Sequence, residues 1–234
     1  MQAEWGSAMS KKITKYILML ICIPMVILLG AVIFDDKQPA FISLMVVILS
    51  LIPVFLTFEK KNLGTRKLII ISVMTALSVI GRFIFAVVPG FKPVTAIVVI
   101  TAMFFGGETG FLTGVLSAFI SNFYFGQGPW TPFQMFAWGM LGLLAGLFSR
   151  PLKNSKICLV LYGVFAGMVY SFIMDIWTVL WYSSEFNLNM YLAALAATAP
   201  YTVTYCVSNV AFLLFLVKPI GDKLTRIRIK YGLS

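Results

Sequence analysis

The sequence predicts an all-α integral membrane protein. Of its 234 residues, 60% are hydrophobic and only 11% are charged. The mean hydropathy is +0.97, and the charges lie in short clusters between long apolar runs. A soluble domain needs far more polar surface than this. The composition therefore excludes a soluble enzyme, a disordered tail and a nucleic-acid-binding domain.

Eight apolar segments are expected to form the helices. A helical span needs about 20 apolar residues, and glycine-rich turns at 106–108 and 126–129 divide the middle of the chain into three shorter pieces. The expected spans are 17–34, 41–58, 68–89, 94–105, 109–125, 133–149, 157–182 and 190–217. The fourth span is only about 18 Å long at helical rise, so we expect it to be tilted, partly re-entrant or extended through its flanks.

Cationic residues lie mostly on one side of this topology. With eight spans, 15 of the 18 Lys and Arg residues fall in the loops and termini of a single side, and cytoplasmic loops carry such an excess. Both termini are therefore expected to be cytoplasmic in a multi-pass protein of the bacterial cell membrane. The net charge of +10 is explained as an orientation signal and as contact with membrane lipid headgroups, so nucleic acid is not expected as a partner.

Composition divides the chain into four parts. Residues 1–9 look like the remnant of an expression tag, and residues 10–67 hold two N-terminal transmembrane helices and a cytoplasmic loop. Residues 68–218 form a six-helix membrane unit, and residues 219–234 form a basic cytoplasmic tail. The three cysteines are few, widely spaced and placed in or beside apolar runs, so we expect no disulfide framework.

One residue type and several motifs that enzymes commonly use are missing from the sequence. The chain contains no His, the commonest general base and transition-metal ligand. No Gly-Lys dipeptide exists, so the phosphate-binding loop of many ATPases is absent. We expect no catalytic residue, no metal site and no permanently bound cofactor. If the protein moves a substrate uphill, the energy must come from an ion gradient or from a partner subunit.

Two charged side chains lie well inside predicted spans. Arg82 and Asp175 each precede the outer end of their span by seven residues, which places both about 10 Å below the outer surface. Charges at membrane depth are costly and are therefore functional candidates. They could form an ion pair that joins the third and seventh spans or polarises a ligand, or a purely structural pair without ligand contact.

Polar and aromatic residues gather in three turns on the outer side. The segment 122–134 contains two Gly, two Pro and several carboxamides, as expected of a binding loop on a rigid scaffold. Aromatic residues alone at this level more often form an interfacial belt. The candidate ligand-binding residues are Arg82, Phe85, Phe91, Lys92, Asn122, Tyr124, Gln127, Trp130, Thr131, Gln134, Trp138, Asp175 and Trp181.

Small residues four positions apart allow helices to approach closely. Such pairs occur at Gly110/Gly114, Gly142/Gly146, Gly163/Gly167 and Ser72/Ala76. We expect most of them to pack inside the protein. Ser72 and Ala76 lie on the cytoplasmic half of the third span, where a partner membrane subunit could dock.

Four segments resemble a known family. They are 81–83 (GRF), 89–94 (PGFKPV), 110–114 (GFLTG) and, above all, 121–139 (SNFYFGQGPWTPFQMFAWG). They resemble the substrate-binding S component of energy-coupling factor (ECF) vitamin transporters, and most of all the cobalamin type. The resemblance covers 68–217 and implies a six-helix S-component bundle, here preceded by two extra transmembrane helices that the usual plan lacks.

The resemblance also implies a function and partners. An S component of this type captures cobalamin from outside and joins an ECF transmembrane scaffold subunit that carries two ATPase subunits, so cobalamin would be a transported ligand. The scaffold usually contacts an Ala-x-x-x-Ala patch on the first helix of the six-helix unit. Ser72 and Ala76 stand at that place here, which departs from the pattern but keeps both positions small.

Two alternatives remain open at the level of the sequence. The same architecture could take another vitamin, such as thiamine or a queuosine precursor. A stand-alone, ion-driven secondary transporter could instead use Asp175 as its proton or sodium site. An intramembrane enzyme ranks last, because no base, metal site or nucleophile motif is present.

Overall fold

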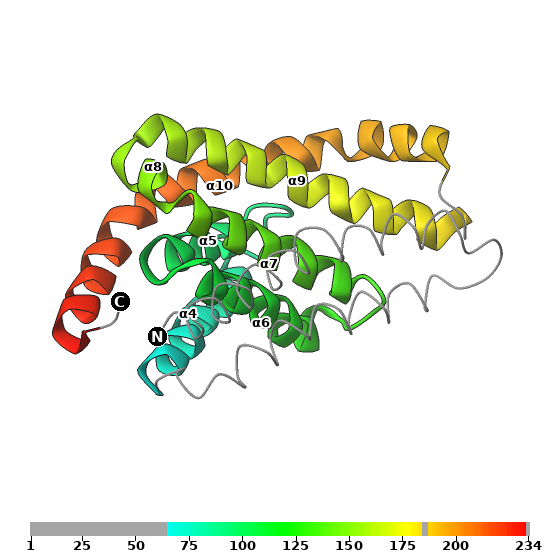
Figure 1. The fold of residues 1–234 in the computed structure, drawn as a ribbon. Coiled ribbons are helices and arrows are strands. Elements are labelled where there is room, and N and C mark those ends of the chain that lie inside the picture. Colours follow the sequence, from blue (N-terminus) through cyan, green and yellow to red (C-terminus); the bar gives the residue numbers. More distant parts are fainter. Residues whose placement is uncertain (1–64, 184–186, 233–234) are drawn as a thin grey trace, which may run out of the picture.

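The computed structural model describes residues 65–183 and 187–232. Within these ranges the chain is helical apart from short turns, which confirms the all-α prediction (Figure 1). The helices are α4 (Thr65–Ile84), α5 (Val94–Phe105), α6 (Gly107–Phe125), α7 (Thr131–Leu147), α8 (Ser149–Asn154), α9 (Lys156–Ser183) and α10 (Leu188–Tyr231). The spans predicted at 17–34 and 41–58 and the tag remnant predicted at 1–9 lie outside the described residues.

Glycine sets the boundaries of the three central helices. α5, α6 and α7 begin and end within two residues of the predicted limits. Gly106 and Gly126 end α5 and α6 with φ of +92° and +98°, a backbone region that residues with a Cβ rarely adopt. Pro132 in the first turn of α7 has the fixed φ that a helix start favours.

α4 is shorter than predicted and is followed by a turn that enters the protein. The helix ends at Ile84, and residues 85–93 form tight turns that include Gly90 at φ +79°. Two prolines, at 89 and 93, oppose helix continuation because each lacks an N–H and restricts the residue before it. The turn places Lys92 at the interior end of this segment.

α10 extends far beyond its predicted end at 217. It contains Pro200 and Pro219, and Figure 1 shows that its last part turns away from α9 towards α4. Proline is a common cause of such bends. Leu224 is buried after the bend, and Arg66 of α4 donates a 2.7 Å hydrogen bond to the carbonyl of Tyr231. The segment predicted as a basic tail is therefore largely helix that packs on α4.

α5 forms the centre of the bundle. Its first ten residues are all buried, because α4, α6, α7 and α10 all pack against it. A helix enclosed by protein on every side does not need the length of a lipid-exposed span. This explains how a segment of only 12 residues serves as the core of an apolar bundle.

The three predicted glycine pairs pack inside the protein, as expected. A Cβ on Gly114 of α6 would lie 2.5 Å from the Trp138 carbonyl of α7, and one on Gly142 would lie 2.5 Å from the Gly110 carbonyl. On the other side of the bundle, a Cβ on Gly167 of α9 would lie 2.7 Å from Cys206 of α10. Helices α6 and α7 therefore touch backbone to backbone, which fixes Trp138 relative to α6.

Three helices in the described part are long and apolar enough to cross a membrane, judged by length and composition. They are α4, α9 and α10, and α5 is a shorter apolar helix. The exposed surface of these helices is rich in large apolar side chains, such as Ile69, Leu161 and Phe215. These features agree with a multi-pass membrane protein.

Candidate ligand-binding site

Arg82 is the first element of the site and lies in the last turn of α4. Its side chain is buried at 8% exposure. The guanidinium donates to Ser121 Oγ and, at 2.8 Å, to Asn122 Oδ1 of α6. The same group lies 4.4 Å from the ring centre of Phe125 and 5.3 Å from that of Trp138. Arg82 thus joins α4 to α6 through neutral oxygen atoms and aromatic faces.

Asn122 connects this cation to α7. Its side chain is completely buried, and its amide nitrogen donates to Thr131 Oγ1 and to Gln134 Oε1, both at 2.9 Å. The Thr131 hydroxyl donates to Gln127 Oε1 at 3.0 Å. A buried amide is costly without partners, and here both ends of the Asn122 amide are hydrogen-bonded. The network holds the turn between α6 and α7 in one conformation.

Lys92 enters the site from the turn between α4 and α5. Its backbone N–H donates to Ser208 Oγ of α10 at 2.9 Å, and that hydroxyl donates back to the Lys92 carbonyl at 3.1 Å. The ammonium lies 5.6, 5.6 and 5.1 Å from the ring centres of Trp138, Tyr170 and Tyr205. Aromatic faces attract a cation at these distances, so three helices enclose Lys92 in an aromatic box.

The electrostatics of the box are unusual for a lysine. Burial, and after it the nearby charge of Arg82, lowers the pKa of Lys92 to about 7. Two walls of the box support each other, because Trp138 and Tyr170 stack with ring centres 5.2 Å apart and 15° between planes. The box is therefore a preformed aromatic surface beside two buried basic groups.

Asp175 lies in α9 and does not pair with Arg82. Its carboxylate is buried and accepts a 2.8 Å hydrogen bond from the Thr198 hydroxyl of α10. Arg82 uses Ser121 and Asn122 instead. The ion pair that the sequence allowed is thus not formed in the described structure, because each charge has a nearer polar partner on a neighbouring helix.

Four further predicted residues fall into two groups in the structure. Phe85 and Phe91 pack with Phe212 of α10, at 4.9 and 5.0 Å between ring centres, and so hold the α4–α5 turn. Tyr124 and Trp181 are exposed at 75% and 51% and lie outside the hydrogen-bonded cluster.

Trp130 and Gln127 belong to the turn that closes the site. The Trp130 ring covers Gly128, where a Cβ would come within 2.3 Å of it. Gln127 anchors the turn to α6 by donating to the Phe119 carbonyl at 2.9 Å. These two residues therefore shape the rim of the site.

Sequence reasoning missed three contributors from α9 and α10. They are Tyr170, Tyr205 and Ser208. Tyr170 follows Gly163 and Gly167 on one helical face, at the i+3 and i+4 spacing that links residues of a common surface. That spacing was the available signal for Tyr170, whereas Tyr205 and Ser208 had none beyond their positions in an apolar run.

The fold and the site together define a helical membrane protein with a polar, aromatic-lined cluster where α4 and α6 end and α7 begins. Residues 62–218 match the family described as ECF-type riboflavin transporter, S component. The chain belongs to this family, which is not an enzyme family, and the S-component resemblance of the sequence is confirmed. The description of this family names riboflavin, whereas the sequence resemblance is to the cobalamin type.

The individual relatives that match the chain share less than 30% identity with it over the aligned part. UPF0397 proteins of Vibrio atlanticus (strain LGP32) and Aliivibrio fischeri (strain MJ11) are 29% and 28% identical to the chain over 98 residues. The aligned part covers 40% of this chain and 53% of each relative. The chain thus spans about half the length of the curated relatives it matches. No solved structure matches it.

Proposed function

We propose that the chain is the substrate-binding subunit of an ECF-type transporter and that it captures cobalamin from outside the cell. The bound vitamin would pass through a partner membrane scaffold powered by two separate ATPase subunits. The observation that carries this proposal is the buried network of Arg82, Asn122 and Gln134 beside the aromatic box. Asn122, Gln134 and Trp138 of this site lie in the segment 121–139, where the sequence resembles the cobalamin type most closely.

The chemistry of the site suits such a ligand. Cobalamin carries many amides and one phosphate, which amides, hydroxyls and basic groups can hydrogen-bond. Trp138 and Tyr170 form a buried stacked pair, and aromatic rings of this kind pack against conjugated rings. Because the chain contains no His, no imidazole of the protein would bind the cobalt, and recognition would depend on shape and periphery.

Riboflavin is the second candidate, and the description of the matching family favours it. Its flat ring system would stack on the same pair of aromatic side chains. Its carbonyl groups and ring nitrogens would take hydrogen bonds from amides such as Asn122 and Gln134. The two candidates differ strongly in size, and only cobalamin carries a phosphate, so binding measurements separate them.

One face of α4 supports the proposed docking to a scaffold. Ser72 and Ala76 are exposed, and Ser72 turns its hydroxyl back to the Leu68 carbonyl at 3.0 Å. Large apolar side chains on the same face are also exposed: Ile69, Val73, Leu77 and Ile80. Small residues between larger apolar ones permit close helix contact within a membrane.

Calorimetric titration of the purified chain in detergent tests the ligand. The titrants are cobalamin, cobinamide, riboflavin, thiamine and a queuosine precursor. The proposal predicts saturable binding of cobalamin, weakened at least about tenfold by Trp130→Ala or Gln134→Ala with the protein still folded. Binding of riboflavin but not of cobalamin would make riboflavin the ligand. Unchanged ligand affinity in both variants would overturn the proposed binding site.

A further inference from the structure

Two buried cations stand close together in this site. The guanidinium of Arg82 and the ammonium of Lys92 lie 5.3 and 5.6 Å from the ring centre of the same residue, Trp138. The two charges are therefore at most about 11 Å apart by these distances. Arg82 belongs to α4 and Lys92 to the α4–α5 turn. The fold therefore brings the two cations together around Trp138.

Neither cation is paired with a carboxylate among residues 65–183 and 187–232. Arg82 donates to Ser121 and Asn122, which are neutral. The Lys92 ammonium contacts only ring faces in this part of the chain. The buried acid of the described residues, Asp175, accepts its hydrogen bond from Thr198. Two like charges thus lie within about 11 Å of one another around a single aromatic ring, without a described counter-charge.

Such an arrangement is unfavourable for two charged groups, and in the ligand-free protein the lowered pKa of Lys92 relieves it in part. Removing a cation from water costs several kcal/mol unless an opposite charge and hydrogen bonds compensate it. Neutral oxygens and aromatic faces compensate only part of that cost. Charged residues inside membrane proteins commonly mark a ligand or ion path for this reason. An incoming anion would satisfy both groups together.

The number of unused N–H donors on Arg82 and Lys92 also favours an anionic ligand. A guanidinium has five N–H donors and an ammonium has three, and the described hydrogen bonds of Arg82 use a single terminal nitrogen. The remaining donors match the several acceptor oxygens of a phosphate or carboxylate, with which charged hydrogen bonds are strongest. The stacked rings of Trp138 and Tyr170 lie directly beside them.

We propose that Arg82 and Lys92 form one anion-recognition site within the proposed ligand-binding site. It takes a phosphate or carboxylate that belongs to a ligand with conjugated rings, and the rings lie against Trp138 and Tyr170. This inference rests on the proposed function and adds the substrate class: the ligand is anionic where it meets α4. A neutral vitamin and its phosphorylated form are therefore distinguished.

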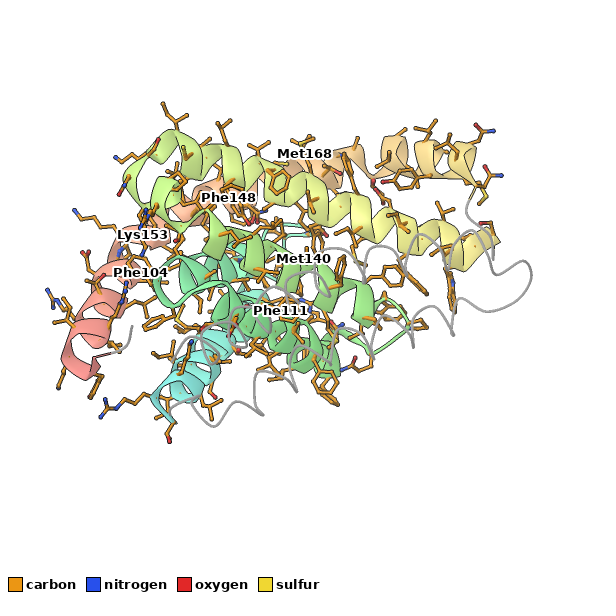
Figure 2. All side chains as sticks on the ribbon, viewed as in Figure 1. Phe104, Phe111, Met140, Phe148, Lys153 and Met168 are labelled. Carbon is orange, nitrogen blue, oxygen red and sulfur yellow. The ribbon has the colours of Figure 1, made fainter. Side chains whose placement is uncertain are left out.

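The test compares ligands that differ in one anionic group. The purified full chain is titrated with riboflavin against flavin mononucleotide, with pyridoxal against pyridoxal phosphate, and with cobinamide against cobinamide phosphate. The variants are Arg82→Gln, Lys92→Gln and the charge-retaining Lys92→Arg. The matched control is Lys153→Gln, because Lys153 of α8 also lies over a ring, 4.7 Å from the centre of Phe104, away from the site (Figure 2).

We expect the ligand that binds to favour its anionic member by at least about tenfold, the size of one charged hydrogen bond. Lys92→Gln and Arg82→Gln remove this preference, whereas Lys92→Arg and Lys153→Gln retain it. Equal affinity of the wild-type chain for both members of a pair that binds would overturn the anion site and leave the proposed function standing.

A vitamin-independent measurement covers the case in which no pair binds. The melting temperature in detergent is measured with inorganic phosphate and with chloride at matched ionic strength. An anion site predicts stabilisation by phosphate in the wild type, in Lys92→Arg and in Lys153→Gln, but not in Lys92→Gln. Binding of no vitamin refutes the proposed function, whereas the same phosphate effect in Lys92→Gln, or none in the wild type, refutes the anion site.

Discussion

Asn122 is the residue on which the geometry of the site depends most. Its amide accepts from Arg82 and donates to Thr131 and Gln134, so it links α4, α6 and α7 through one buried group. Deleting it would remove one hydrogen bond from each of Arg82, Thr131 and Gln134, although Arg82 would keep its bond to Ser121 and Thr131 its bond to Gln127. Each buried polar group that is left unsatisfied costs about 1–3 kcal/mol. A site built in this way is rigid before the ligand arrives, which lowers the entropic cost of binding.

Lys92 gives the ligand-free protein a characteristic pH dependence. Its pKa falls from about 10.4 in the unfolded chain to about 7 in the folded protein, through burial and then the charge of Arg82. Between these values the unfolded chain binds more protons, so the Lys92 contribution makes stability rise as pH increases above 7. The titratable groups facing it are Arg82 of α4, Tyr170 of α9 and Tyr205 of α10.

The corresponding experiment is thermal unfolding in detergent between pH 7 and pH 9. The melting temperature of the wild type should rise over this range relative to that of Lys92→Gln, since only the wild type loses a buried proton. Lys156→Gln, at an exposed position of α9, should follow the wild type. Parallel curves for the wild type and Lys92→Gln would mean that Lys92 keeps an ordinary pKa.

The α6–α7 pair is the element that positions the aromatic surface. Gly114 allows the Trp138 backbone to approach, and Gly142 allows the same for Gly110. The replacement Gly114→Ala places a methyl group 2.5 Å from the Trp138 carbonyl, so the helices must separate. We expect a loss of about 1–3 kcal/mol in stability and weaker ligand binding.

Melting temperature and ligand affinity in detergent measure this effect together. Ala197→Val on the exposed surface of α10 is the control and should change neither quantity. A Gly114→Ala protein with wild-type stability and affinity would show that the helix spacing does not set the position of Trp138.

The exposed face of α4 leads to a prediction about transport. Ser72→Leu and Ala76→Leu each place a bulky group where two helices would meet, so uptake by the assembled transporter should be lost. Ligand binding should be unchanged, because both side chains are exposed on the surface of α4, whereas Arg82 is buried inside the bundle. Ala197→Leu serves as the control, and loss of binding together with uptake would argue against a docking role.

The sequence predicted helix positions well where glycine and proline interrupt apolar runs. The limits of α5, α6 and α7 follow from the turns at 106–108 and 126–129. Helix α10 continues beyond the predicted span 190–217 through residues 218–230, which mix Lys and Arg with apolar residues. Such mixing ends an apolar run, yet in a helix it leaves residues such as Leu224 on a buried face.

The site was predictable only within one segment. Asn122, Thr131 and Gln134 lie close in sequence, and they do meet. Tyr170 and Tyr205 come from two other helices, and no local pattern shows which helices become neighbours in a bundle. The possible Arg82–Asp175 ion pair is not formed for the same reason, because equal depth in the membrane does not make two side chains adjacent.

At the scale of the whole molecule, the described part of the chain separates two tasks. The Arg82–Lys92 end binds ligand in our proposal, whereas the exposed α4 face meets a scaffold. The chain carries no phosphate-binding loop, so the energy for uphill movement would come from the ATPase subunits. We further propose that both termini are cytoplasmic in the bacterial cell membrane, in keeping with the distribution of Lys and Arg.

Uptake of radiolabelled cobalamin into proteoliposomes tests the central claim most directly. The chain is reconstituted alone and together with an ECF scaffold and its two ATPase subunits. We predict no accumulation by the chain alone under any proton or sodium gradient, and ATP-dependent accumulation by the complete assembly that persists in Asp175→Asn. Gradient-driven uptake by the isolated chain, abolished by Asp175→Asn, would contradict the account and identify a secondary transporter instead.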